Sequence, residues 1–255
     1  MHYDPIKDSL AERIKLFPAL RRLFYRALDL LLLRQRYVKA EIERYFRDGM
    51  RFYDAGAGFC QYSDFVLKNY PNSRVLATDL KTEYLRQYSF TSGPRFSYMN
   101  GDLQVFRPKH QYDMAIAIDI LEHIEDDVAV IKNIHSSLSN EGIFIISTPS
   151  RSDPAAHFTA EHVRPGYDKG ELEKKLLDSG FEIVSSAYSY GFFGALSWRL
   201  MIKYPLMLWG KTKLWAPIIA LWYFLLLPVS ELLMRFDMLR TNSSGTGIII
   251  VVRKK

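Results

Sequence analysis

The chain has 255 residues, enough for one sizeable hydrophobic core, and its 48% apolar and 24% charged residues exclude a disordered polypeptide. A single cysteine, Cys60, excludes an intramolecular disulfide framework and a multi-cysteine zinc site. The net charge of +6 is unevenly distributed along the chain. Residues 1–50 carry 11 basic and 7 acidic side chains, residues 51–191 carry 14 basic and 19 acidic ones, and residues 192–255 carry 9 basic and 2 acidic ones. The basic segments are also the most apolar, which favours a membrane surface over nucleic acid as a partner.

The first fifty residues predict two helices, 6–16 and 19–46, separated by Pro18. The second has an apolar stripe with arginines interspersed, which suits either a helix packed on the core or one that faces a membrane or covers a substrate. Residues 1–17 mix charges and lack the apolar run of a signal peptide, so we expect a reducing, cytoplasmic compartment.

From residue 51 onward, strand and helix patterns alternate. Strands are predicted at 51–55, 74–78, 96–99, 112–118, 143–147, 181–188 and 247–252, and helices at 62–69, 82–88, 126–138 and 168–179. This alternation predicts an α/β fold, a doubly wound and mostly parallel seven-stranded sheet with helices on both faces.

A glycine-containing turn, Asp54-Ala55-Gly56-Ala57-Gly58-Phe59-Cys60, follows the first predicted strand. Such a turn lets a ligand approach the backbone, and the helix after it offers free N–H groups. Gly56 and Gly58 begin a dinucleotide-type fingerprint, but its third glycine position is Gln61, so the pyrophosphate motif is incomplete.

Acidic residues lie at or after the ends of the first four strands: Asp54, Asp79, Asp102 and Asp119. The carboxyl ends of parallel strands meet at one edge of a sheet, which is where open α/β sheets bind their ligands. Four carboxylates there disfavour an anionic ligand. They suit one that carries hydroxyls, an amine and a positive charge.

Together these stretches resemble the class I S-adenosylmethionine-dependent methyltransferases, in the broad group that contains ubiquinone-biosynthesis and small-molecule O-methyltransferases. The residues that carry the resemblance are Asp54-x-Gly56-x-Gly58, Asp79, Asp102, Asp119-Ile-Leu-Glu-His-Ile124, Asn140-Glu-Gly142 with Ile145–Pro149, and Asp168–Phe181. The resemblance implies a Rossmann-like methyltransferase core over 51–191 and 246–255, with an N-terminal helical cap over 1–50.

The resemblance also implies roles for individual residues toward S-adenosyl-L-methionine. The cofactor-binding set would be Asp54, Gly56, Ala57 and Gly58 near the methionine part, Asp79 on the ribose with Leu80 beside the adenine, Asp102 and Leu103 at the adenine edge, and Asp119 and Ile120 under the sulfonium end. Arg34, Arg36 or Tyr37 would reach the cofactor carboxylate. Cys60 stands where the family usually has its third glycine, and its side chain is expected to narrow the pocket slightly.

A hydroxyl acceptor would also need a base, and two histidines are candidate catalytic residues. His123 follows the fourth strand and His162 lies in the loop after the fifth, and both loops open on the ligand edge. Each has a plainer interpretation as a structural or loop residue. Asp119, Glu122 and His123 also resemble a group that some relatives use with a divalent metal, but we expect no metal here.

An apolar insertion over 192–245 separates the last two strands. Leu214–Ser230 carries no charge over 17 residues, about 26 Å as a helix and just short of a bilayer core of about 30 Å, although Pro217 and Pro228 make a continuous helix doubtful. The strands on both sides meet the same sheet edge, so an odd number of crossings is excluded. Helices in the membrane interface or a re-entrant dip are favoured, with a substrate lid or dimer contact as the alternative.

These observations predict a methyltransferase, peripheral on the inner face of a membrane with anionic lipids, that acts on a lipophilic small-molecule acceptor. A phenolic or quinone-like hydroxyl is the expected acceptor group, with a lipid-linked carboxylate or amine left open. The alternatives are a non-catalytic membrane scaffold and a nicotinamide-dependent oxidoreductase. Nucleic acid is not an expected partner, and the sequence does not indicate an oligomeric state.

Overall fold

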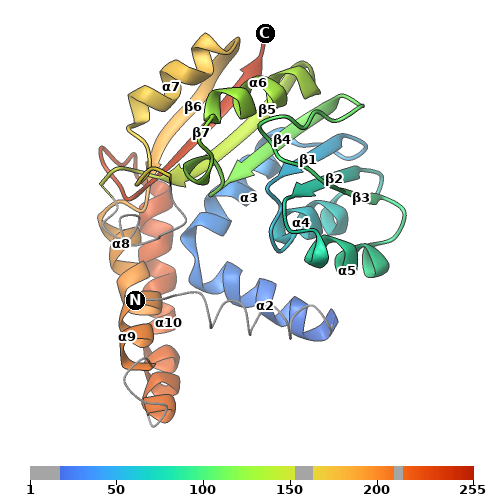
Figure 1. Cartoon of the computed structure of the whole chain (residues 1–255). Coiled ribbons are helices and arrows are strands. Elements are labelled where there is room, and N and C mark those ends of the chain that lie inside the picture. The colour runs from blue at the N-terminus through green and yellow to red at the C-terminus, as the bar shows by residue number, and fades with distance from the viewer. Residues whose placement is uncertain (1–17, 153–162, 210–214) are drawn as a thin grey trace.

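A computed structural model describes residues 18–152, 163–209 and 215–255. At its centre is a seven-stranded sheet in the order β3-β2-β1-β4-β5-β7-β6, in which β7 is antiparallel to both its neighbours (Figure 1). The strands are β1 Arg51–Ala55, β2 Arg74–Asp79, β3 Phe96–Asn100, β4 Tyr112–Ile118, β5 Leu138–Pro149, β6 Phe181–Ser189 and β7 Gly247–Lys254. The predicted α/β fold with a mostly parallel sheet is confirmed.

Helices cover both faces of this sheet. On one face lie α3 (Leu33–Tyr45), α4 (Gln61–Asn69) and α5 (Glu83–Ser92), and on the other α6 (Asp127–Ser137) and α7 (Lys169–Asp178). Strand side chains alternate between the two cores: Met114 and Ile116 of β4 join the first, whereas Ala115 and Ala117 join the second. The sheet is therefore buried on both faces, as the run of apolar residues in β4 predicts.

The N-terminal region differs from the single helix expected over 19–46. Two helices are present, α2 (Pro18–Leu31) and α3, because Leu32 adopts an extended conformation between them. The break lets α3 pack on the sheet while α2 turns toward α4 and α5, where the Tyr25 hydroxyl donates to the Phe59 carbonyl and lies 3.2 Å from the Tyr84 hydroxyl. The helix predicted over 6–16 lies outside the described residues.

Residues after β6 form a helical hairpin that projects from the sheet (Figure 1). Its first arm consists of α8 (Phe192–Trp198), a π-helical segment (Arg199–Lys203) and α9 (Tyr204–Trp209), and its second arm is α10 (Ala216–Leu239). We call these residues the hairpin. β7 is antiparallel to β5 and ends at the edge of the sheet away from the hairpin. The parallel strands therefore end at the edge from which the hairpin leaves.

The expectation that Pro228 would interrupt the second arm is wrong, since α10 continues through it to Leu239. Proline removes one helical hydrogen bond, but contacts with the first arm hold the turns on both sides. The Ser197 and Ser230 hydroxyls are 2.8 Å apart, and the Trp222 indole N–H donates to the Leu200 carbonyl. That carbonyl lies in the π-helical segment, whose altered hydrogen bonding frees backbone groups for such contacts.

Candidate functional site

The turn after β1 is fixed by backbone hydrogen bonds to β2. The N–H groups of Gly56 and Ala57 both donate to the Thr78 carbonyl, at 2.9 and 3.0 Å. Gly56 has a φ of +76°, and a Cβ placed on it would lie 2.6 Å from Ile120 Cγ1. Only glycine therefore fits where the turn after β1 meets the segment after β4.

Cys60 adopts the left-handed backbone, with a φ of 56°, at the position where the resembled family has glycine. Its side chain is fully buried in the core formed with α4, and burial raises the pKa of its thiol. The expectation that it narrows the ligand pocket is not supported, because the side chain packs inward beneath the turn.

Asp79, at the end of β2, holds the two loops beside it. Its carboxylate accepts from the Gly58 N–H at 2.9 Å through one oxygen and from the Lys81 N–H at 2.9 Å through the other. Each carboxylate oxygen has a second lone pair, so both can also accept from the hydroxyls of a ribose. The neighbouring Leu80 is 67% exposed and offers an apolar surface for a purine ring.

Asp102 lies one loop further along the same edge. It accepts from the Gln104 N–H at 2.9 Å, and the neighbouring Leu103 is buried in the second core. The Asn100 amide donates to the Leu80 carbonyl, which ties this loop to the one after β2. Asp79, Leu80 and Asp102 are thus held together at the carboxyl ends of adjacent strands, as predicted.

The segment after β4 forms the other half of the site. Asp119 has a φ of 51°, and its N–H donates to the Ser147 carbonyl at 2.8 Å. Its carboxylate forms an ion pair with Arg34 of α3, while its other oxygen, Oδ1, is buried without a hydrogen-bond partner. Of the three residues expected to reach a cofactor carboxylate, only Arg34 points here; Arg36 pairs with Glu231 and Tyr37 bonds to Asp237, both on α10.

Two carboxyl groups near this segment are strongly buried. Glu122 accepts from the Thr148 hydroxyl at 3.1 Å, its Oε1 has no partner, and burial raises its pKa. Asp54 accepts from the Ser63 hydroxyl at 2.7 Å, and burial raises its pKa to about 7. The sequence marked Glu122 only as part of a metal-like group, because nothing local indicates its contact with Thr148.

His123 ends a 3-10 turn over Leu121–His123 and is half-buried beside Glu122. His162 lies outside the described residues. No group of three or more histidine, cysteine, aspartate or glutamate side chains converges on a metal-sized site within the described ranges. Two members of the metal-like group noted in the sequence have other partners: Asp119 forms an ion pair with Arg34, and Glu122 accepts a hydrogen bond from Thr148.

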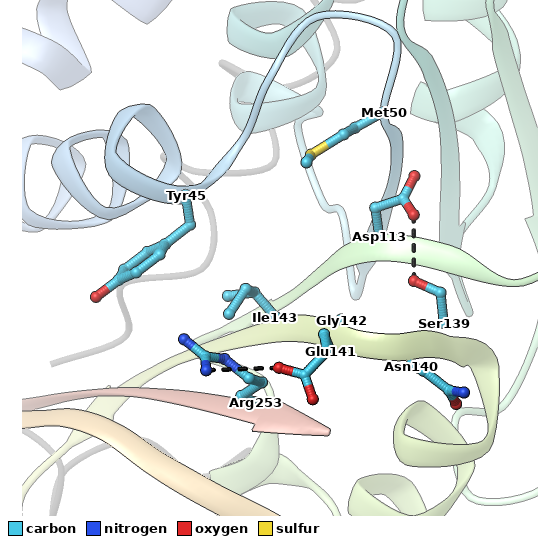
Figure 2. A pocket seen from close by; sticks show the side chains of 9 residues that line it. All are labelled: Tyr45, Met50, Asp113, Ser139, Asn140, Glu141, Gly142, Ile143 and Arg253. Atoms are coloured by element: carbon cyan, nitrogen blue, oxygen red, sulfur yellow. Dashed lines mark hydrogen bonds and ion pairs between the residues drawn. The ribbon is translucent and has the colours of Figure 1, made fainter. Parts of the chain in front are cut away.

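A separate cavity of about 480 Å³ lies at the opposite edge of the sheet, where β1, β4 and β5 begin (Figure 2). Figure 2 shows Asp113 facing Ser139 and Glu141 facing Arg253, at 3.1 and 3.5 Å. Both carboxylates are therefore engaged by neighbours, and the cavity is remote from the loops after β1, β2 and β4.

Asp54 makes the stability of the protein depend on pH. Its unfolded pKa is near 3.9 and its folded pKa is about 7, so its stabilising contribution is complete below pH 4 and is lost as pH rises toward 7. Between pH 5 and pH 7 the free energy of unfolding should fall by roughly 2 kcal/mol relative to an Asp54→Asn variant, which cannot ionise. Denaturant unfolding at both pH values tests this. Parallel profiles for the two proteins would contradict it.

The residues at the carboxyl edge fit S-adenosylmethionine. Asp79 offers acceptors for its ribose, exposed Leu80 a face for its adenine, and Gly56 a close backbone approach. The cofactor is cationic, and Asp119 has a buried carboxylate oxygen without a hydrogen-bond partner at this edge. S-adenosylmethionine supplies an activated methyl group, so the protein mainly has to orient the acceptor and exclude water.

Comparisons with known proteins agree with a methyltransferase fold and activity. Residues 53–144 match the family described as a methyltransferase domain. A trans-aconitate 2-methyltransferase of Enterobacter sp. (strain 638) is 25% identical over 117 residues, which span 46% of this chain and 45% of that protein. A ubiquinone biosynthesis O-methyltransferase of Rickettsia canadensis (strain McKiel) is 23% identical over 168 residues, 59% of this chain and 71% of that protein.

A solved structure extends the comparison beyond the matched domain. The phosphoethanolamine N-methyltransferase 2 of Haemonchus contortus, in complex with S-adenosyl-L-methionine, aligns with a TM-score of 0.59 at 15% identity. The alignment covers 84% of this chain and 51% of that one, and at this identity it shows the fold. The sheet order, the glycine turn and the match of residues 53–144 to a methyltransferase domain together support a class I S-adenosylmethionine-dependent methyltransferase.

Proposed function

We propose that this protein methylates a hydroxyl of a lipophilic acceptor at a membrane surface, with the hairpin dipping into the lipid. The observation that carries the proposal is the exposure of α10. Among the described helices it alone is long and apolar enough to cross a membrane, and only 11% of its most apolar 18-residue window is buried. A core helix of a water-soluble domain would be mostly covered by protein.

Large apolar side chains are exposed along most of the hairpin. They are Phe192, Tyr204, Met207, Trp209, Ile218, Leu221, Phe224, Leu225, Val229, Leu232, Phe236 and Leu239. Contiguous exposed apolar surface of this kind marks an interaction site with a membrane or a protein. The hairpin leaves the sheet at the edge that binds the cofactor, so a membrane contacted by it would lie on the side where methyl transfer takes place (Figure 1).

The charges of the described hairpin residues suit shallow insertion. Arg199 and Lys203 are exposed on the first arm, while α9 and the first fifteen residues of α10 carry no charge. Long basic side chains extend toward lipid phosphates while their stems stay in the apolar layer. Lys211 and Lys213 lie outside the described residues.

The hairpin is firmly attached to the methyltransferase core. Asp237, near the end of α10, is fully buried and accepts from the Gly194 N–H at 2.9 Å and from the Tyr37 hydroxyl at 3.0 Å. Tyr37 belongs to α3, which also carries Arg34. One helix therefore joins the base of the hairpin to Asp119, which favours a fixed distance between a lipid surface and the reaction site.

Chemistry at this edge supports a neutral or weakly acidic acceptor. Asp79 and Asp102 add negative charge beside the Arg34–Asp119 ion pair, and this charge disfavours an anionic acceptor at the edge. Among the relatives, the ubiquinone biosynthesis O-methyltransferase agrees with a lipophilic hydroxyl, whereas the trans-aconitate enzyme is named for a soluble carboxylate. His123 and His162 remain the predicted bases.

Incubation with labelled S-adenosylmethionine and vesicles made from a host lipid extract should place label in the organic phase, identified by mass spectrometry. Leu225→Ser on α10 should lower vesicle binding and lipid labelling at least tenfold, because burying one leucine is worth about 1.5–3 kcal/mol. Leu177→Ser on α7 makes the same change on a similarly exposed residue away from the hairpin and should behave as wild type.

Two results would overturn the proposal. One is label confined to water-soluble compounds, which would favour an acceptor of the trans-aconitate kind. The other is equal vesicle binding by the Leu225→Ser and Leu177→Ser variants, which would assign the apolar hairpin surface to another role. Cofactor binding, measured by calorimetry, should be the same in all three proteins.

A further inference from the structure

A second, smaller cavity of about 160 Å³ lies between α2, α3 and α4, and its lining includes none of the predicted cofactor-binding residues. Four of its lining side chains are basic and two are acidic: Arg22, Arg26, Lys39 and Lys68 against Asp29 and Asp64. We call this cavity and its six charged residues the basic cleft. Its excess of two positive charges indicates an anionic ligand.

The carboxylates of the basic cleft are already engaged by its lysines. Lys39 pairs with Asp29, and Lys68 pairs with Asp64 one helical turn earlier on α4. Arg22 and Arg26 have no carboxylate partner among the described residues, and both are exposed. Two guanidinium groups one helical turn apart, neither paired with a carboxylate of the described ranges, therefore line the cleft in the arrangement that suits phosphate oxygens.

The same helix presents an apolar stripe to solvent. Ala19, Leu23 and Leu30 are exposed, with Leu23 at 62%, and their spacing places them on one face of α2 beside Arg22 and Arg26. An apolar stripe flanked by basic residues is typical of helices that lie in a membrane interface. In Figure 1, α2 and the hairpin lie on the same side of the sheet, beyond its carboxyl edge.

We propose that the basic cleft binds the phosphate of an anionic phospholipid headgroup while Leu23 and Leu30 contact the acyl layer. The proposal rests on the membrane location put forward above and identifies a second, chemically specific contact with the lipid. Arg22 and Arg26 would bind the phosphate, and the paired lysines would add positive potential around it.

The aromatic side chains of the basic cleft argue against a nucleic acid in the same place. The Tyr25 hydroxyl is bonded to the Phe59 carbonyl and the residue is buried, and the ring of Phe65 is covered by the Lys39 ammonium, 5.0 Å from its centroid. Neither ring is therefore free to stack on a base, which is how single-stranded nucleic acids are generally held. A headgroup requires only the cationic side chains.

The test compares an Arg22→Gln/Arg26→Gln variant with an Arg51→Gln/Arg74→Gln control. The control makes the same charge change on exposed arginines at the first residues of β1 and β2, at the opposite edge of the sheet. Co-sedimentation with phosphatidylcholine vesicles containing 30% phosphatidylglycerol should fall about 30-fold for the first variant, since each basic residue near an anionic leaflet is worth roughly fivefold. The control should bind as wild type.

A soluble short-chain phosphatidylglycerol, used below its micelle concentration in calorimetry, tests the basic cleft without a membrane. It should bind wild type and the control and lose binding to Arg22→Gln/Arg26→Gln, whereas inorganic phosphate should bind more weakly because it lacks the acyl chains. Equal loss in both double variants, or no loss in either, would overturn the headgroup site. Tighter binding of inorganic phosphate would reassign the cleft to a soluble anion.

Failure of this inference can be told apart from failure of the proposed function. If Arg22→Gln/Arg26→Gln keeps full vesicle binding while Leu225→Ser loses it, the headgroup site is wrong and the hairpin alone contacts the membrane. If wild type binds no vesicles but still binds the soluble lipid, the membrane location is wrong and the basic cleft is a lipid-phosphate site in solution.

Discussion

Replacing Asp79 by alanine is expected to weaken S-adenosylmethionine binding at least 100-fold. As the predicted ribose-binding residue, Asp79 would accept from both ribose hydroxyls, and each hydrogen bond to a charged group contributes about 1.5–3 kcal/mol. The loss of two such bonds corresponds to 3 kcal/mol or more, and every 1.4 kcal/mol is tenfold in affinity. Titration calorimetry of the purified variant with the cofactor measures the effect directly.

Asp48→Ala is the matched control for this change. Asp48 is exposed, whereas Asp79 is half-buried. Asp48 also holds a loop, since it accepts from the Asn72 N–H at 2.8 Å, and that bond lowers its pKa. It lies before β1, at the edge of the sheet away from the candidate site. Both variants should lose a little stability, but only Asp79→Ala should lose the cofactor. Equal affinities would remove Asp79 from the binding site.

The part of the site that the sequence predicts is the part held by neighbouring strands. Asp79 and Gly58 lie 21 residues apart, yet they meet because β1 and β2 are adjacent and parallel, with Ala55 in register with Thr78. Strand periodicity and the order of elements are enough to place such residues at one edge. For this reason the sequence alone predicts that the acidic residues after the strands lie together.

The sequence does not predict the contacts that the N-terminal helices make with the hairpin and with the site. The sequence offers three residues as partners of a cofactor carboxylate and does not distinguish them. The packing of α3 places Arg34 against Asp119 and Tyr37 against α10. The break at Leu32 and the passage of α10 through Pro228 are likewise set by tertiary contacts that override local preference. Local patterns carry little information on helices whose partners lie about two hundred residues away.

Gly56→Ala is expected to destabilise the protein by about 3 kcal/mol and to abolish cofactor binding. Two effects add: a left-handed backbone at φ +76° costs a non-glycine residue roughly 1 kcal/mol, and the new methyl would collide with Ile120 at 2.6 Å, which costs about 1–3 kcal/mol if the loops must shift. Because the shift displaces the segment after β4 against the glycine turn, both halves of the site are disturbed together.

Gly58 separates the two effects. Its φ is +48°, but nothing lies within 4 Å of a Cβ built on it, so Gly58→Ala should cost only the conformational part, roughly 1 kcal/mol. Ile120→Ala in the Gly56→Ala background should recover the steric part and leave the conformational part, giving a favourable coupling energy of 1 kcal/mol or more in a double-mutant cycle. Denaturant unfolding of the four proteins measures this coupling. If the two changes in the free energy of unfolding were strictly additive, the turn after β1 and the segment after β4 would not be in steric contact. The contact between Gly56 and Ile120 would then play no part in shaping the cofactor site.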